Sequence, residues 1–305
     1  MSVALIAIDW GTTAARAYRF DRHGHILDRT SAPLGVQKVA AGGFPDALRL
    51  LLDGESEDVP RIACGMIGSR QGWVEAPYRD CPAGFTAIVS ALTPVPGACL
   101  SIVPGLVCRD AAGVPDVMRG EETQIFGAFD EQEARDGARQ VVVLPGTHSK
   151  WALVDAHGIE TFATFMTGEL YAVLLEHSIL GRNVATGSDA AALEDGVKRS
   201  LDGDASLSHD LFSARTLALM SKLAPAAVGD YLSGLLLGAE IAAGRRWLER
   251  HAVKEESVTL IGDAPLCERY RRALAIAGVD AMIGSPDAAA RGLWRIARHA
   301  GMVRT

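Results

Sequence analysis

The chain lacks any run in which lysine and arginine cluster, although it has 30 of these residues against 37 aspartates and glutamates, for a net charge of −7. Proteins that bind nucleic acid usually present a clustered basic surface, so the sequence predicts no nucleic-acid partner. The negative net charge bears on solubility and only weakly on the choice of ligand. A small anionic substrate is still compatible with the sequence if basic residues converge locally.

Cysteine is also scarce. The five residues include no C-x-x-C pair, and their number is odd; they are Cys64, Cys81, Cys99, Cys108 and Cys267. This pattern argues against a disulfide framework and against a zinc knuckle. We therefore predict free thiols in a reducing compartment.

Long hydrophobic runs are missing as well. The N-terminus has no basic region of the kind found in signal peptides, and its short apolar run ends at Asp9, which favours a first strand. The most apolar later stretch, Tyr231–Gly244, is too short to span a bilayer and contains Glu240. The sequence therefore predicts a cytoplasmic protein with no membrane partner.

The length predicts two domains, because 305 residues exceed what one hydrophobic core usually organises, about 250–300 residues. Apolar residues make up 49% and charged residues 22%, which is typical of globular proteins. Strand patterns at 61–66, 100–103 and 258–261 alternate with helix patterns at 44–52, 170–180, 228–248, 266–277 and 287–299, and another helix begins at 123. We predict an α/β fold with a mixed sheet in each half, divided near Ala134. The polar segment Glu131–Arg139 is expected to be a surface helix or a connection.

An internal similarity supports two domains of the same kind. The first copy runs VALIAI, DWGTT, ARAYRF and DRHG, and the second runs QVVVL, PGTHS, KWALV and DAHG. Each copy predicts an apolar strand, a Gly-Thr turn, a second strand, a D-x-x-G turn and a third strand. Two ordinary hairpins with common turn residues are the alternative explanation.

The first Gly-Thr turn carries the residues of a phosphate and metal site. Asp9 ends a buried strand and can hold a hydrated Mg²⁺ against phosphate oxygens. Gly11 lets backbone N–H groups approach an anion, and the hydroxyls of Thr12 and Thr13 add donors. The second copy offers another such turn, with Gly146, Thr147, His148 and Lys150, but no acid at the strand end.

Several continuous motifs extend this pattern along the chain: DWGTT and LIGDAPLCERY, and CGMIGSRQGWVEAPY, MRGEETQIFGAF, LPGTHSKWALV and TFMTGELYAVLLEHSILG. With these motifs the sequence resembles the 2-dehydro-3-deoxygalactonokinase family of the sugar kinase, Hsp70 and actin superfamily. The resemblance implies two ribonuclease H-like domains with mixed sheets flanked by helices and an active site in the interdomain cleft. Residues 1–133 would bind sugar acid and phosphate, and residues 134–305 would bind the nucleotide. The implied reaction is phosphorylation of 2-dehydro-3-deoxy-D-galactonate to its 6-phosphate with ATP and Mg²⁺, in galactonate catabolism.

The catalytic base is expected at the helix start Arg119-Gly120-Glu121-Glu122, where related carbohydrate kinases carry a G-D-Q-type sequence. Phosphoryl transfer needs positioned phosphates, neutralised charge and a base for the attacking hydroxyl. The spacing differs from the family pattern by one residue, which leaves Glu121 and Glu122 as alternatives, and we favour Glu121, the first carboxylate after Gly120. A carboxylate there also stabilises the helix dipole.

Further candidates fall into two groups. For the sugar acid they are Ser69, Arg70, Gln71, Trp73, Arg119 and Lys150; for the nucleotide they are Gly11, Thr12, Thr13, Arg16, Gly146, Thr147, His148, Gly262, Asp263 and Ala264. Ser69, Arg70, Gln71 and Trp73 are the favoured group for the sugar acid, because an arginine can bind a carboxylate and a tryptophan can cover a sugar face. Each group has a structural alternative: Trp73 as core, Arg70 and Arg16 as surface charges, and Asp263 as a helix N-cap.

Other functions compatible with the sequence are a kinase for another sugar or sugar acid, a phosphatase or NTPase, and a non-catalytic nucleotide-gated binding protein. The lack of an appended peptide-binding domain argues against a chaperone. The expected partners are small molecules, and a homo-oligomer is compatible with the sequence. Dependence of ADP production on added sugar acid would separate these functions.

Overall fold

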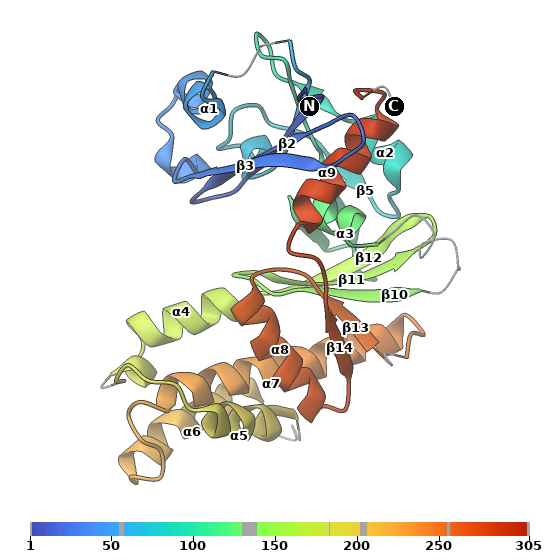
Figure 1. The fold of residues 1–305 in the computed structure, drawn as a ribbon. Coiled ribbons are helices and arrows are strands. Elements are labelled where there is room, and N and C mark those ends of the chain that lie inside the picture. The colour runs from blue at the N-terminus through green and yellow to red at the C-terminus, as the bar shows by residue number, and fades with distance from the viewer. Residues whose placement is uncertain are drawn as a thin grey trace. The chain divides into compact units, whose positions relative to one another are not determined.

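The computed structural model describes residues 2–54, 58–129, 139–182, 184–201, 206–254 and 257–303 (Figure 1). The predicted boundary near Ala134 lies outside the described residues. The chain forms two compact units. The first unit contains residues 1–138, 153–162 and 285–305, and the second contains residues 139–152 and 163–284.

The main sheet of the first unit has six strands in the order β3-β2-β1-β4-β7-β6. They are β1 (Leu5–Trp10), β2 (Ala15–Phe20), β3 (Ile26–Ala32), β4 (Arg61–Gly65), β6 (Thr93–Pro94) and β7 (Leu100–Ile102). A second sheet contains β5 (Tyr78–Asp80), β8 (Gly105–Arg109) and β9 (Pro115–Met118). The helices are α1 (Phe44–Leu52), α2 (Phe85–Val89), α3 (Glu121–Ala128) and α9 (Ala288–His299), with short 3₁₀ turns at Val36–Lys38 and Met66–Gly68.

The sheet of the second unit has the order β12-β11-β10-β13-β14. Its strands are β10 (Gln140–Leu144), β11 (Ser149–Asp155), β12 (Gly158–Phe165), β13 (Ser257–Leu260) and β14 (Asp280–Ile283). Five helices follow or separate them: α4 (Thr167–His177), α5 (Ala190–Leu201), α6 (Leu207–Leu219), α7 (Val228–Arg250) and α8 (Ala264–Ile276), with a 3₁₀ turn at Ile179–Gly181.

Both sheets begin with three consecutive strands in reverse order and continue with two later ones, and the first sheet has β6 as an additional strand at its edge. In the first sheet β1 pairs with β2 in the antiparallel direction and with β4 in the parallel direction. In the second sheet β10 pairs with β13, and β13 with β14, in the parallel direction. This shared order is that of the ribonuclease H-like fold, and it confirms the predicted α/β class and the two copies of the strand-turn pattern.

The apolar sequences explain the central strands. Every residue of β1 except Asp9 is buried, as expected for a strand covered on both faces. Helix α1 begins at the predicted Phe44 and buries one apolar face against β2 and β3. The core of this unit gathers around Ile6, Ile8 and Trp10, together with Leu48 and Leu51 of α1.

The C-terminal helix returns to the first unit. Figure 1 shows α9, in red, beside α3, and two glycines permit this packing. A Cβ at Gly127 would lie 1.9 Å from the backbone oxygen of Ala288, and one at Gly292 would lie 1.8 Å from that of Thr123. The two units therefore differ from the predicted domains 1–133 and 134–305, because residues 153–162 and 285–305 pack with the N-terminal part.

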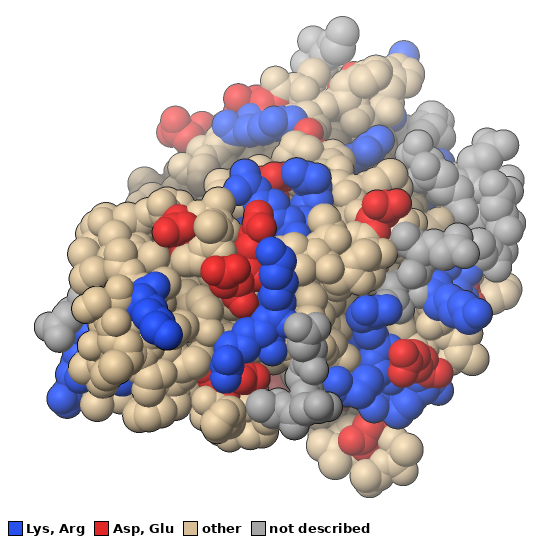
Figure 2. Space-filling view, turned by 90° about the horizontal axis from the view of Figure 1, so that it is seen from below, with Lys and Arg blue, Asp and Glu red and all other residues tan. Residues whose placement is uncertain are grey.

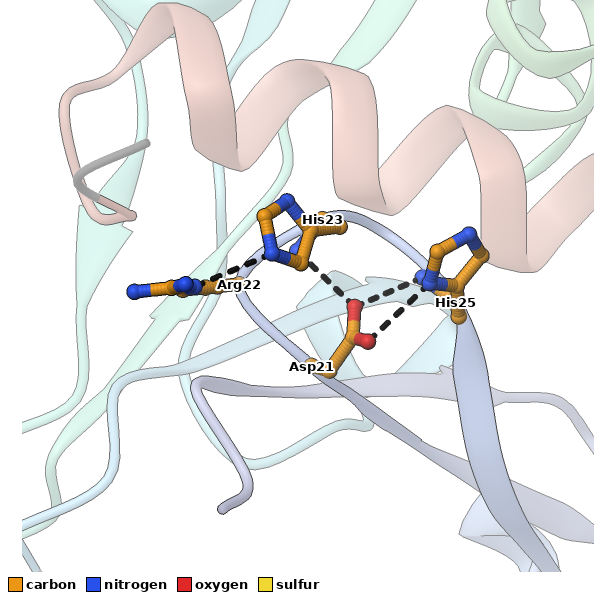
Figure 3. Close-up of polar contacts among 4 residues, drawn as sticks. All are labelled: Asp21, Arg22, His23 and His25. Carbon is orange, nitrogen blue, oxygen red and sulfur yellow. Dashed lines mark hydrogen bonds and ion pairs between the residues drawn. The ribbon is translucent and has the colours of Figure 1, made fainter. Parts of the chain in front are cut away.

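The D-x-x-G turn after β2 is closed by its aspartate. Asp21 accepts hydrogen bonds from the backbone N–H groups of His23 and His25 and contacts the His25 ring at 3.0 Å (Figure 3). Burial opposes ionisation, but these hydrogen bonds hold the pKa of Asp21 at about 2. Gly24 has a positive φ of 88°, and a Cβ there would meet the Trp294 indole at 2.6 Å.

Some elements differ from the expectations. The helix expected from 123 begins at Glu121, and the helix expected at 170–180 spans Thr167–His177. The three-stranded sheet, α2, α5, α6 and β14 were not predicted. The segment predicted as a surface helix or connection, 131–139, lies outside the described residues except for Arg139.

In the described ranges, no helix combines the length and apolarity needed to cross a membrane. The view in Figure 2 shows lysine and arginine side chains lying among aspartates and glutamates on that face.

Candidate functional site

Asp9 is the least buried residue of an otherwise buried strand. It stands opposite Arg16 on β2 and opposite Cys64 on β4. Its Oδ2 lies 3.5 Å from Nη1 of Arg16, and its Oδ1 lies 4.0 Å from the Cys64 sulfur. The carboxylate therefore sits at the end of the central strand, with one cation beside it.

Burial raises the pKa of Asp9, and the charge of Glu121 adds to this, while Arg16 acts in the opposite direction. The Arg16 side chain is 59% exposed, so solvent weakens its effect. A second cation close to Asp9 would thus be stabilised. This electrostatic situation suits a metal-phosphate ligand.

The DWGTT turn is held by neighbouring backbone. Gly11 donates its N–H to Ala14, and the oxygens of Gly11 and Thr12 accept from Val36 and Gln37. Gly35 is required beneath the turn, because a Cβ there would lie 2.2 Å from the carbonyl carbon of Thr13. Both threonines are exposed. The turn is fixed while its threonine side chains are accessible to a ligand.

Gly65 and Gly120 bring the start of α3 close to the ends of β1 and β4. Gly65, with a φ of 89°, ends β4 next to Trp10, and a Cβ at Gly120 would lie 3.2 Å from the Gly65 Cα. Gly120 itself has a φ of 108°. These conformations strongly favour glycine. They place the two candidate carboxylates of α3 near Asp9.

The two glutamates of α3 have different surroundings. Glu121 is partly exposed, and its Oε2 accepts from the backbone N–H of Arg119 at 2.9 Å. Glu122 is fully buried and accepts from the N–H of Gly120 at 2.7 Å and from the Thr123 hydroxyl at 3.0 Å. Burial raises the pKa of Glu122 to about 7, with a further contribution from the charge of Glu121. Of the two, Glu121 is the one accessible to a ligand.

The residues predicted to bind the sugar acid differ in their burial. The hydroxyl of Ser69 and two guanidinium nitrogens of Arg119, Nε and Nη1, are buried without a hydrogen-bond partner among the described residues. Arg70 is 88% exposed and lies 3.6 Å from Glu75, and Gln71 is also exposed. Trp73 stacks on Phe44 at 6.0 Å and packs against the core, as its structural alternative predicted.

In the second unit the loop 146–148 is held against the start of α4. A Cβ at Gly168 would lie 2.4 Å from the oxygen of Gly146, and the N–H of Glu169 donates to the Thr147 oxygen. The His148 ring pairs with the Glu169 carboxylate. Lys150 is buried and donates to the His148 oxygen at 3.1 Å. Gly146 itself has open space where a Cβ would be.

The same loop lines a pocket of about 490 Å³. Gly146, Thr147 and Asp263, predicted from separate motifs, come together there. Gly262 has a φ of 154° and lies against Pro145, and Asp263 precedes α8 without a side-chain capping bond. The sequence analysis missed other lining residues, Tyr171, Ser233 and Arg269. Arg269 donates to Ser233 and pairs with Asp230, and no local motif marks these contacts.

A buried carboxylate connects β11, α7 and α8 next to this pocket. Glu240 of α7 accepts from Ser149 at 2.7 Å, from the Trp151 indole at 2.9 Å and from the Tyr270 hydroxyl at 2.8 Å. Burial raises the pKa of Glu240, which these hydrogen bonds oppose. The network joins β11, directly after the Gly-Thr loop, to α8.

The described residues contain no cluster of three His, Cys, Asp or Glu side chains that could hold a metal alone. Mg²⁺ does not need one, because it usually keeps several waters and binds one or two carboxylates plus phosphate oxygens. Asp9, with its raised pKa and the nearby charge of Glu121, fits that role.

The chain is similar to known proteins over nearly its whole length. A family model described as 2-keto-3-deoxy-galactonokinase matches residues 9–296. The 2-dehydro-3-deoxygalactonokinase of Escherichia coli (strain K12) is 36% identical over 303 residues, covering 98% of this chain and 99% of that protein. The probable 2-dehydro-3-deoxygalactonokinase DgoK1 of Rhizobium meliloti (strain 1021) is 37% identical over 308 residues, covering 94% and 97%. A crystal structure of a Sinorhizobium meliloti protein, provisionally given the same enzyme name, superposes with a TM-score of 0.86 at 35% identity and covers 96% of this chain and 98% of that one.

Proposed function

Because the chain belongs to the 2-keto-3-deoxy-galactonokinase family, we propose that it transfers the γ-phosphoryl group of ATP to the 6-hydroxyl of 2-dehydro-3-deoxy-D-galactonate. The family assignment confirms the sequence-based prediction of a carbohydrate kinase. The similarity to the Escherichia coli enzyme, over 98% of this chain, carries the proposal. We also propose a cytoplasmic location, which the five free cysteines support.

Asp9 is the proposed ligand of the Mg²⁺ ion that neutralises the phosphate charge. Mg²⁺ held there would supply charge stabilisation at the transferred phosphoryl group. The Gly11-Thr12-Thr13 turn would position the phosphates through its backbone and hydroxyl groups. Arg16 would add positive charge, since its exposed side chain already lies beside Asp9.

Glu121 is the proposed base for the attacking hydroxyl. It lies near Asp9, is partly exposed and begins a helix whose position is set by Gly65 and Gly120. Glu122 suits this role poorly, because both of its oxygens are engaged and the side chain is buried. We assign Glu122 to holding the turn instead.

The pocket of the second unit is the proposed nucleotide site. Gly146 and Thr147 would contact phosphates, and Gly262, Asp263 and Ala264 would lie beside the adenosine. These residues lie in the second unit, and Asp9 lies in the first.

The test is a coupled assay of ADP production with a panel of 2-keto-3-deoxy sugar acids, neutral sugars and no acceptor. We expect turnover with the galactonate derivative and little ADP without an acceptor. Glu121→Gln should lower kcat by at least tenfold with both KM values nearly unchanged, because a base acts mainly in the transition state. Glu194→Gln, a half-exposed carboxylate of α5 that pairs with Lys198, is the control for a general charge effect. Equal ADP production with and without every acceptor would refute the kinase proposal.

A further inference from the structure

Arg119 has buried guanidinium donors that no described residue uses. Its Nε and Nη1 atoms are inaccessible to solvent and lack a hydrogen-bond partner among the residues with described positions. Leaving charged donors buried and unpaired costs free energy that an acceptor arriving from outside would recover. The side chain therefore has donors suited to an anionic ligand.

The guanidinium is held in place rather than loosely packed. Nη2 donates to the Ala76 oxygen at 2.8 Å, and the group lies 4.3 Å from the centre of the Tyr78 ring. Two glycines make the space: a Cβ at Gly68 would approach Nη1 to 3.0 Å, and one at Gly105 would approach the Tyr78 ring to 2.6 Å. Such a fixed cation is typical of a binding site that is organised before its ligand arrives.

A second unused donor belongs to the residue that follows Gly68. The Ser69 hydroxyl is buried without a described partner, and Ser69 directly follows Gly68, whose backbone Arg119 approaches. A guanidinium and a hydroxyl together are well matched to a carboxylate. The backbone N–H of Arg119 also donates to Oε2 of Glu121, so the main chain of Arg119 lies beside the proposed base.

The other basic candidates have weaker geometry for this task. The Arg70 side chain is 88% exposed and lies beside Glu75, which would compete with an incoming carboxylate. Lys150 belongs to the second unit and already donates to the His148 oxygen. Of the three, Arg119 is the one that combines buried donors lacking a hydrogen-bond partner among the described residues with a guanidinium held in place by another contact.

We propose that Arg119, assisted by Ser69, binds the carboxylate of the sugar acid and thereby makes the enzyme select acids over neutral sugars. The inference rests on the proposed function and adds to it the residue that recognises the acid group. It places the specificity for the acid in the turn after β4 and in the residues just before α3.

The experiment measures kcat and KM for the sugar acid, for its analogue with a hydroxymethyl group in place of the carboxylate, and for ATP. Arg119→Ala should raise the sugar-acid KM by about ten- to a hundredfold, as expected for a lost charge-assisted hydrogen bond. The KM values for ATP and for the neutral analogue should change little. Ser69→Ala should raise the sugar-acid KM less, and Arg109→Ala, an exposed arginine of β8, is the matched control.

Arg119→Lys and Ser69→Ala keep the test decisive if Arg119→Ala does not fold. Added methylguanidinium should partly restore the sugar-acid KM of Arg119→Ala, which a purely structural defect would not allow. An unchanged sugar-acid KM in all Arg119 and Ser69 variants would overturn the inference, as would loss of acid selectivity in Arg70→Ala instead. A wild-type protein that phosphorylates none of the acids would refute the proposed function, a result separate from either of these.

Discussion

Glu122 should make the protein less stable as the pH rises from 4.5 to about 7. Its side chain is fully buried, and burial raises its pKa from an ordinary 4.5 to about 7. Between these values the folded state binds a proton that the unfolded state releases, so stability falls as pH rises through this interval. The contribution is fully present below pH 4.5 and is lost as pH rises through about 7.

The change in the free energy of unfolding follows from the difference between the folded and unfolded pKa values of Glu122. About 2.5 pKa units at 1.36 kcal/mol each correspond to roughly 3 kcal/mol between pH 4.5 and pH 8. For a chain of this size we expect about 2 °C or more in Tm per kcal/mol, or roughly 5–10 °C in total. Glu122→Gln should remove this part of the pH dependence, since the amide oxygen can still accept from the Gly120 N–H group.

The assay is thermal unfolding of wild type and Glu122→Gln at several pH values from 5 to 8. The variant should gain stability relative to wild type as pH rises. Glu75→Gln serves as the control, because the Glu75 side chain is 56% exposed in the same unit. Parallel pH profiles for wild type and Glu122→Gln would show that Glu122 does not titrate in this range, and the reasoning would be wrong.

Two further predictions concern Asp9 and the α3–α9 packing. Asp9→Asn should lower turnover by about 10²–10³-fold without lowering Tm, because burial already opposes ionisation of Asp9; near wild-type turnover at saturating Mg²⁺ would remove Asp9 from the mechanism. Gly127→Ala should destabilise the first unit by about 1–3 kcal/mol or more, since its Cβ would lie 1.9 Å from the Ala288 oxygen; an unchanged unfolding transition would contradict the described packing.

Local patterns predicted the elements whose residues interact mainly with near neighbours. Apolar periodicity and turn residues predicted the two strand-turn-strand copies, the helix at Phe44–Leu52 and a strand at 61–66, which the structure ends at Gly65. The family resemblance, carried by continuous motifs, predicted the fold class as well. By contrast, the sheet of β5, β8 and β9 is built from short, partly exposed strands that leave little periodic signal.

The sequence predicted which residues belong to the candidate site, but it did not predict which of them are buried and which are exposed. The sequence favoured Arg70 over Arg119 and Lys150 as the cation for the sugar acid, and it favoured Glu121 over Glu122 as the base. The structure separates them by burial: Arg70 is exposed, Glu122 is enclosed and Trp73 belongs to the core. Their catalytic and binding roles stay predictions until the variants are measured.

The sequence by itself determined the strands of the two strand-turn copies, the Gly-Thr turns and the family, because these depend on residues adjacent in the chain. Only the tertiary structure decided that α9 packs with α3 and that the Arg119 guanidinium is enclosed by Ala76, Tyr78 and Gly68. Those partners are distant in sequence from the residues they contact. The burial of a long polar side chain depends on such distant segments, and local sequence periodicity does not predict which of these segments will be in contact.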